Sequence, residues 1–247
     1  MSDQLIYLLM TGMNSVQDRM TASSNNLANV GTTGFKAQQP AFEAVPFYGQ
    51  GLPDRADVVA QEEQPNFKSG PINTTGRPLD VAIDGPGWIG VQASDGSTAY
   101  TRDGSLYIAP SGTLMTAGGF PVLDQNGNPI VLPALSQITI GSDGTISGVP
   151  QGQQPDAIVA YARIDLANPP PQNMKRRPDG LFQDGNGNFS VDGNVTLKVG
   201  ALEGSNVSSV GVMVDMIKNT RMFQMQTQML HTIATLGTGN ESPLTLQ

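Results

Sequence analysis

The sequence predicts a mainly β protein with α-helical ends, in which an antiparallel β domain lies between N- and C-terminal helices that pair in a coiled-coil-like manner. Two observations predict this class. Apolar residues recur at intervals of three and four near both ends of the 247-residue chain and almost nowhere between them. The middle instead holds short strand-like runs separated by turns that contain glycine.

The first helix is defined by a narrow apolar stripe that follows a heptad a/d pattern, with Ser23 filling one missing step. Gly12 weakens this helix without breaking it. Gly31 and Gly34 predict that the helix stops near Val30. Because so narrow a stripe cannot bury itself, the helix needs a partner. The stripe consists of Ile6, Leu9, Met13, Val16, Met20, Leu27 and Val30.

A second helical pattern near the C-terminus supplies a partner. Asn206 is the expected N-cap of this helix. The main stripe passes through Thr220 and Thr227 and contains Met213, Met216, Phe223, Leu230 and Ala234. A second stripe widens the apolar face with Met222, Met225, Met229, Ile233 and Leu236. Two interpretations are open: the helices form an ordinary hairpin inside one globular domain, or both are assembly elements that await other subunits.

Composition and charge narrow the class of function. Only 38% of the residues are hydrophobic, whereas 29 Gly and 18 Pro indicate many turns. The net charge is −8, and the acidic excess falls in the middle of the chain. An acidic body argues against nucleic-acid binding, which needs a basic stripe. The lack of cysteine excludes disulfides, thiol catalysis and Cys-based zinc sites.

Four segments are expected along the chain: a first helix with its exit over 1–36, a connector over 37–75, an antiparallel β domain over 76–202, and a second helix with a tail over 203–247. The connector is expected to be ordered, although a mobile linker is the alternative. Its apolar anchors are Phe35, Phe42, Val45, Phe47 and Tyr48. After Gly237 the tail looks less helical, which leaves the end of the second helix open.

Short strands and tight turns predict the β domain. The expected strands are Leu79–Ile83, Trp88–Gln92, Thr98–Thr101, Ser105–Ile108, Gln137–Ile140, Ile158–Ile164 and Val195–Leu202. Asp-Gly and Asn-Gly steps favour the turns that join antiparallel strands. These steps begin at Asp84, Asp95, Asp103, Asn126, Asp143, Asp179, Asp184, Asn186 and Asp192, which is too many for an α/β fold with long crossovers.

Several motifs resemble cofactor-binding or metal-binding sites. The glycines of Gly85–Gly90 have dinucleotide-binding spacing but lead into a strand rather than a helix, so we expect no cofactor. Asp124–Asn128 and Asp184–Asn188 resemble fragments of calcium loops, yet neither has the closing Glu, and hairpin turns explain both. The basic run Lys175–Arg177 is interpreted as a solvated loop. We expect no metal site.

No catalytic constellation is predicted. The single histidine, His231, falls within the second helix, where a surface or interface role is expected. Turn chemistry accounts for carboxylates such as Asp80, Asp84 and Asp103, and their spacing selects no acid/base pair. We therefore expect neither an enzyme nor a small-molecule substrate.

The N-terminus and the overall hydropathy predict no membrane insertion. Asp3 and Gln4 stand where a cleaved secretion signal carries positive charge. No run of about 18 apolar residues is present, so no transmembrane helix is predicted. We expect any export to proceed without a cleaved signal.

Three segments together resemble the bacterial flagellar rod and hook proteins. Ser24–Lys36 matches the N-terminal signature of that family, and Arg77–Trp88 with Tyr100–Gly104 matches its β-domain motif. Gly204–Val207, followed by Met216–Ile217 and Arg221–Phe223, matches its C-terminal signature. The matches occur in family order and frame nearly the whole chain. The length and the run Arg221–Gln226 resemble a proximal-rod member most, and a distal-rod member second.

The resemblance implies a structural subunit of the flagellar basal-body rod, which crosses the periplasm. Its terminal helices would pair as an axial domain, contact copies of the chain and other rod proteins, and become ordered only on assembly. Export would use the flagellar type III apparatus. The expected assembly contacts are Ile6, Leu9, Met13, Val16, Met20, Leu27, Met213, Met216, Phe223 and Leu230, and Asn26, Asn29, Gly34 and Phe35 would shape the exit from the first helix. Alternatives are a hook-type axial protein and, more remotely, a secreted β-rich binding module.

Overall fold

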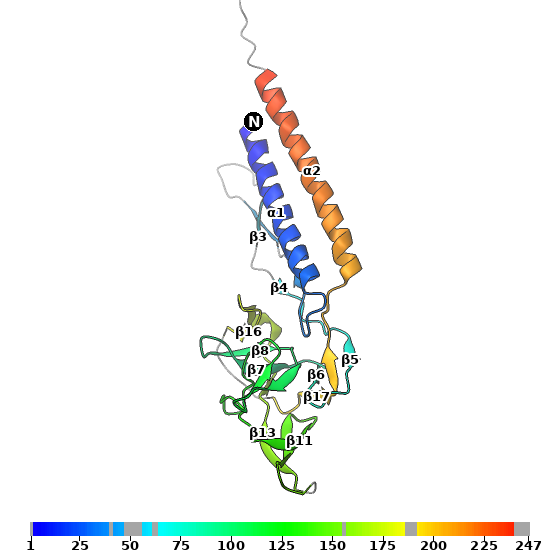
Figure 1. Cartoon of the computed structure of the whole chain (residues 1–247). Coiled ribbons are helices and arrows are strands. Elements are labelled where there is room, and N and C mark those ends of the chain that lie inside the picture. Colours follow the sequence, from blue (N-terminus) through cyan, green and yellow to red (C-terminus); the bar gives the residue numbers. More distant parts are fainter. Residues whose placement is uncertain are drawn as a thin grey trace, which may run out of the picture. The chain divides into compact units, whose positions relative to one another are not determined.

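A computed structural model describes residues 2–39, 42–46, 56–60, 64–154, 157–185 and 192–239. Two long helices stand at the ends of the chain, α1 (Ser2–Ala28) and α2 (Ser209–Gly239), and short strands fill the sequence between them (Figure 1). The chain divides into two compact units. A helical unit contains Met1–Ala28, Gln38–Gln64 and Ser208–Gln247, and a β unit contains Asn29–Ala37 and Pro65–Val207.

The helical unit is built on α1 and α2, which lie side by side and run in opposite directions (Figure 1). It also contains an antiparallel hairpin in which β2 (Phe42–Pro46) pairs with β3 (Ala56–Ala60), and β3 lies beside α1. A short strand, β1 (Gln38–Gln39), belongs to the same unit. The expected connector thus holds regular structure that its irregular sequence pattern did not indicate. Its anchors Phe47 and Tyr48 lie outside the described residues.

The helix ends differ from the predicted ones in detail. α1 ends at Ala28, two residues before Val30, and α2 extends to Gly239. The prediction that Asn206 caps α2 is wrong. The Ser208 hydroxyl oxygen accepts a hydrogen bond from the Gly211 amide at 3.3 Å, so Ser208 caps the helix. Ser and Asn are both good caps, and the side chain of Asn206 is engaged elsewhere.

The strand pairs described within the β unit are antiparallel, as predicted. The largest sheet has the order β14-β7-β8-β16-β15, and a second has the order β11-β12-β13. Three further pairs are β17-β6, β18-β5 and β10-β9. The strand bounds are β4 Gln64–Pro65, β5 Ile72–Thr74, β6 Val81–Asp84, β7 Trp88–Gln92, β8 Thr98–Thr101, β9 Leu106–Ile108, β10 Leu114–Thr116, β11 Leu135–Ile140, β12 Thr145–Pro150, β13 Val159–Arg163, β14 Leu166–Ala167, β15 Met174–Arg176, β16 Phe182–Asp184, β17 Thr196–Val199 and β18 Ala201–Glu203, with a 3₁₀ turn at Pro171–Asn173.

The predicted strands Trp88–Gln92 and Thr98–Thr101 are found without change as β7 and β8. The single strand predicted over Val195–Leu202 is instead two strands, β17 and β18. They meet at Gly200, whose φ of 70° interrupts the extended backbone. This break lets β17 pair with β6 while β18 pairs with β5.

Two apolar clusters form the core of the β unit. The larger one collects aliphatic side chains from most strands, including Ile83, Ile89 and Leu197. The smaller one is aromatic and contains Trp88, Tyr100 and Phe182. The Trp88 and Phe182 ring centroids are 4.7 Å apart. The aromatic cluster is important for the site because the guanidinium carbon of Arg102 lies 5.5 Å from the Trp88 ring centroid.

The Asp124–Asn128 segment is a hairpin turn, as expected. One carboxylate oxygen of Asp124 accepts hydrogen bonds from the Asn126 and Asn128 amides at 2.9 and 2.8 Å, and Gly127 supplies the positive φ. The corresponding residues Asn186–Asn188 lie outside the described part of the chain. Within the described residues, neither helix has the length and hydropathy needed to cross a bilayer.

Candidate functional site: a buried ion-pair junction

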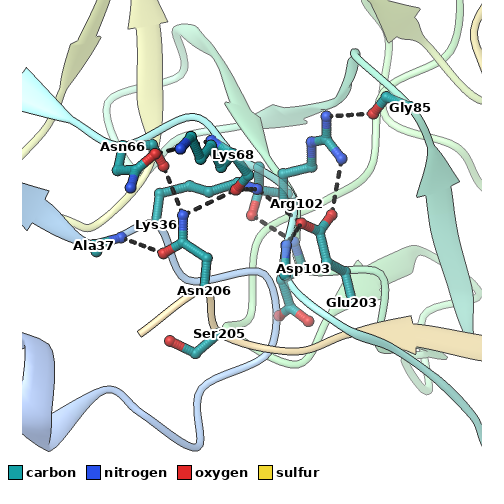
Figure 2. Close-up of polar contacts among 12 residues, drawn as sticks. Lys36, Ala37, Asn66, Lys68, Gly85, Arg102, Asp103, Glu203, Ser205 and Asn206 are labelled. Carbon is teal, nitrogen blue, oxygen red and sulfur yellow. Dashed lines mark hydrogen bonds and ion pairs between the residues drawn. The ribbon is translucent and has the colours of Figure 1, made fainter. Parts of the chain in front are cut away.

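The β unit contains a buried carboxylate held by two cations from distant parts of the chain. Glu203 at the end of β18 is 1% exposed. Its Oε1 accepts hydrogen bonds from Lys36 Nζ at 2.7 Å and from the Gly70 amide at 2.8 Å, and its Oε2 accepts one from Arg102 Nη1 at 2.8 Å. Figure 2 shows Arg102 reaching Glu203 on one side and the Gly85 carbonyl on the other. We call Lys36, Arg102 and Glu203 the junction.

Electrostatics keep this carboxylate ionised. Burial by itself raises the pKa of Glu203, but the hydrogen bond from Lys36 and the charge of Arg102 outweigh it, so the net pKa is below its ordinary value. Burial lowers the pKa of Lys36, and Glu203 opposes that change. Two buried cations share one carboxylate, and Lys36 Nζ also donates to the Lys68 carbonyl at 2.9 Å. Removing the carboxylate would leave both cations without a counter-charge.

The side chain of Asn206 forms hydrogen bonds to residues that lie close to points where the chain leaves or enters the β unit. Its side-chain oxygen accepts a hydrogen bond from the Ala37 amide at 2.7 Å. Its side-chain nitrogen donates to the carbonyls of Asn66 and Lys68 at 2.8 and 2.9 Å (Figure 2). Ala37, Asn66 and Asn206 all lie within two residues of a passage. The residue predicted to cap a helix therefore gathers the ends of three segments inside the β unit.

The predicted exit residues occupy specific positions. Asn26, in the helical unit, exchanges two hydrogen bonds of 2.8 Å with the backbone of Gln38. The carbonyl of Asn29 accepts a hydrogen bond from the Thr32 amide at 3.2 Å. Phe35 is buried, and its ring centroid lies 4.5 Å from the Arg176 guanidinium carbon.

Gly34 lies where no side chain fits. Its φ is 68°, and a Cβ at this position would be 2.3 Å from the carbonyl carbon of Arg102. Its amide donates to the Glu203 carbonyl at 2.8 Å. The turn after the first helix therefore lies directly against two residues of the junction.

The interpretation of Lys175–Arg177 as a solvated loop is wrong. Lys175 and Arg176 belong to β15, and Arg176 donates a hydrogen bond of 3.1 Å to the Lys36 carbonyl. Arg177 pairs with Asp95 at 2.9 Å and with Asp179 at 3.1 Å. A run of charges looks solvated in the sequence because two of its partners, Lys36 and Asp95, lie far from it along the chain.

The predicted assembly residues lie on α1 and α2 of the helical unit. On α1, Val16 is buried, and Ile6, Leu9, Met13, Met20 and Leu27 are half-buried. On α2, Met216, Phe223 and Leu230 are half-buried, whereas Met213 is 51% exposed. The inner face of α2 consists of its least exposed residues, which recur at intervals of three and four. It also includes two polar residues, Asn219 and Gln226.

The outer face of α2 is rich in apolar side chains. With 3.6 residues per turn, Val210, Val214, Ile217 and Met225 point away from the inner face, whereas Met213 and Met229 lie at its edges. All are between 44% and 71% exposed: Val210, Met213, Val214, Ile217, Met225 and Met229. On α1, Tyr7, Leu8 and Met10 are exposed as well, each by more than half. The helical unit therefore presents apolar surface that no described residue covers.

The carboxylates considered for catalysis have structural partners. Asp80 accepts hydrogen bonds from Thr75 and Arg77, and Asp103 accepts one from the Ser105 amide. His231 is exposed on α2. Within the described ranges, no three His, Asp or Glu side chains are grouped to hold a metal ion. The arrangement of the site positions chain segments rather than reacting atoms.

The fold and the junction define a class of protein whose chain begins and ends in long helices and carries an antiparallel β body between them in the sequence. Comparisons with known proteins identify the family. Residues 6–36 match the family described as Flagella basal body rod protein, residues 82–148 the Flagellar hook protein FlgE/F/G D1 domain, and residues 198–236 the Flagellar basal body rod FlgEFG protein C-terminal domain.

The similarity extends over the whole chain. The flagellar basal-body rod protein FlgF of Salmonella typhimurium is 37% identical over 238 residues, and FlgF of Escherichia coli is 38% identical, with 94% of each chain covered in both cases. FlgG of Bacillus subtilis is 34% identical over 92% of this chain and 94% of its own. The chain belongs to the flagellar basal-body rod protein family. The predicted resemblance is confirmed: FlgF is the proximal-rod member and FlgG the distal-rod member that it placed first and second.

Each residue of the junction lies in or directly beside one of the three signature segments. Lys36 ends the first segment, Arg102 lies in the second, and Glu203 immediately precedes the third. Sequence reasoning identified the segments but missed the ion pairs, because no spacing links residues that are 167 and 101 positions apart.

Proposed function

We propose that this chain is a structural subunit of the bacterial flagellar basal-body rod and that it assembles through its terminal helices. It acts by contacting its neighbours rather than by catalysis, a role that fits relatives named as rod proteins. The proximal rod is the proposed position, since the FlgF relatives share 37–38% identity with the chain. The distal rod is the alternative, because a FlgG relative shares 34%.

The exposed apolar faces of α1 and α2 support this proposal most strongly. A helix that displays Val210, Ile217 and Met225 to solvent gains free energy when another protein covers them. Full burial of such a side chain contributes about 1.5–3 kcal/mol. The chain has a net charge of −8 and, as a monomer, gains no free energy from exposing these apolar residues. We propose that neighbouring rod subunits, including copies of this chain, cover them.

The same proposal assigns roles along the chain. In chain order, segments 1–36 and 203–247 carry the helices of a coiled-coil-like axial domain, 37–75 is the connecting segment, and 76–202 carries most of the outer body. The proposed assembly contacts are the ten helical residues named above, from Ile6 to Leu230. Asn26, Asn29, Gly34 and Phe35 set the direction in which the chain leaves α1. A head-to-tail helical contact does not close on itself and so builds a tube.

The proposed location is the rod where it crosses the periplasm, reached through the flagellar type III export apparatus. Isolated helices are stabilised mainly by packing of their apolar faces. We therefore propose that the helical ends become fully ordered when subunits join, which limits premature polymerisation.

Replacement of an outward apolar side chain tests this function. Ile217→Asp is expected to stop incorporation into the rod and to abolish swimming when it replaces the native chain, because it places a charge on the covered face. The β unit should remain folded, as reported by the fluorescence of Trp88. Val131→Asp is the matched control, since Val131 is a similarly exposed apolar residue of the β unit. Normal incorporation of Ile217→Asp would contradict assembly through the helices.

A further inference from the structure

The inner face of α2 carries two amide side chains among apolar ones. Apart from Ser209 and Met222, every position from 209 to 235 that is not exposed follows a four-three spacing. These positions are Val212, Met216, Asn219, Phe223, Gln226, Leu230 and Ile233. Asn219 is only 8% exposed. Gln226 Oε1 is buried and has no hydrogen-bond partner within the described residues. The helix thus turns amides inward while its opposite face displays apolar side chains.

Gln226 lies against the one glycine of α1. A Cβ on Gly12 would be 3.0 Å from Gln226 Nε2, which is closer than most real Cβ contacts. The long amide therefore occupies space that the missing side chain leaves free. Glycine is unfavourable inside a helix, so its presence opposite a large polar residue indicates a matched pair rather than a random gap.

We call residues that face each other at the same height along the two antiparallel helices a level. One heptad from the level of Gly12 and Gln226 lies a second polar level. Seven residues make about two turns on each helix. Moving from Gly12 along α1 reaches Arg19, and moving the same distance back from Gln226 along α2 reaches Asn219. Val16 and Phe223 stand at an apolar level between the two polar ones. The sequence of levels is thus polar, apolar, polar.

We propose that Gln226 and Asn219 determine the register in which α1 and α2 pair. A single polar residue in a helical seam can specify register at a cost in stability. A slip of one heptad in one direction would bring Arg19 level with the apolar Val212. A slip in the other direction would set Gln226 level with Arg19 and Asn219 level with Asn26, which keeps polar residues opposite one another. The inward amides therefore oppose the first displacement. The inference extends the proposed function, since register decides which outward side chains a subunit presents together.

Disulfide trapping tests the register directly, because the chain has no cysteine of its own. The native register sets Val16 level with Phe223, and the disfavoured one-heptad slip sets it level with Met216. The variants Val16→Cys/Phe223→Cys and Val16→Cys/Met216→Cys would be oxidised mildly as purified full-length protein. The yield of the intramolecular disulfide in each is then measured on non-reducing gels. The native pair is expected to give about tenfold more intramolecular disulfide than the slipped pair, because the free-energy cost of one mismatched buried polar group corresponds to about that ratio.

Leucine substitution should remove this preference. Adding Asn219→Leu and Gln226→Leu is expected to bring the two yields close to equality while raising the helix content measured by circular dichroism. The matched control adds Gln224→Leu and Gln228→Leu, two exposed residues of the same helix, and should keep the preference.

Three results would overturn the proposal: equal yields in the parent pairs, no disulfide in either pair, or an unchanged preference in the inner leucine variant. These results are separate from the test of assembly. If Ile217→Asp still blocks incorporation, the proposed function stands and only the register proposal fails.

Discussion

Glu203 illustrates how one carboxylate can organise a whole site. It is acceptor to Lys36, Gly70 and Arg102, three groups that are far apart in the sequence. A buried ion pair of this kind adds little net stability compared with apolar packing, but loss of one partner is costly. The role of Glu203 is therefore to make one arrangement of these segments far better than any other.

Glu203→Gln is expected to lower the free energy of unfolding of the β unit by about 3–5 kcal/mol, because it leaves two buried cations without compensation. Urea unfolding followed by Trp88 fluorescence measures the change. Asp215→Asn is the control: it removes an exposed ion pair with Lys218 and should alter stability by less than about 1 kcal/mol. Equal unfolding midpoints for Glu203→Gln and the parent chain would show that the junction does not organise the β unit.

Asp165 is a second buried carboxylate with the opposite electrostatics. It is 5% exposed, and burial and the charge of Asp124 raise its pKa to about 6. Its Oδ1 has no hydrogen-bond partner among the described residues. Its other oxygen lies so close to Gly90 that a Cβ there would be 2.3 Å away. The ionised form is therefore poorly accommodated at neutral pH.

Asp165→Asn is expected to raise the free energy of unfolding at pH 7.5 by about 1–3 kcal/mol. The sign follows from the raised pKa: the folded state binds the proton more tightly than the unfolded one, so the parent gains stability as pH falls from about 6 toward 3.8. The difference between the variant and the parent should therefore shrink by pH 5. Urea midpoints at both pH values test this, and a difference independent of pH would refute it.

At the scale of elements, regular patterns were predictable and mixed ones were not. The terminal helices follow from apolar periodicity, and β7 and β8 from short runs between Asp-Gly turns. The hairpin of β2 and β3 escaped prediction because its sequence shows no sustained alternation. The inward amides of α2 escaped because a search for apolar periodicity passes over Asn219 and Gln226 and selects their neighbours Thr220 and Thr227 instead.

The exit turn after α1 gives a prediction with an internal control. Gly34→Ala is expected to destabilise the β unit by more than about 1 kcal/mol, since its φ is 68° and the new Cβ would meet the Arg102 backbone. Gly31→Ala should have little effect, because no atom lies within 4 Å of a Cβ at that position. Thermal denaturation of both variants distinguishes them. Similar losses in both would mean that the turn tolerates a side chain.

At the scale of the whole molecule, the sequence indicated the family and the order of the segments, but not how they interleave. Each compact unit is assembled from separate stretches of chain, so the chain passes between the units four times. Local pattern cannot reveal this, because it depends on contacts such as those of Asn206 with Ala37 and Asn66. The division into four consecutive segments remains a prediction about chain order.

Limited trypsin digestion tests the expected difference between the ends and the body. Lys36 and Arg102 are buried, whereas Lys218 has 68% of its side chain exposed. Early cleavage is expected near Lys218 and Arg221, with slow loss of a fragment that still contains the junction. Mass spectrometry of the products identifies the cut sites. Rapid cleavage at Lys36 or Arg102 would contradict a stable β unit.

The distance along the sequence between Lys36 and Glu203 also affects how the β unit folds. During synthesis Lys36 is made long before Glu203, which lies 167 positions further along the chain. The buried ion pair can therefore form only when most of the polypeptide is present, and the β unit stays incomplete until then.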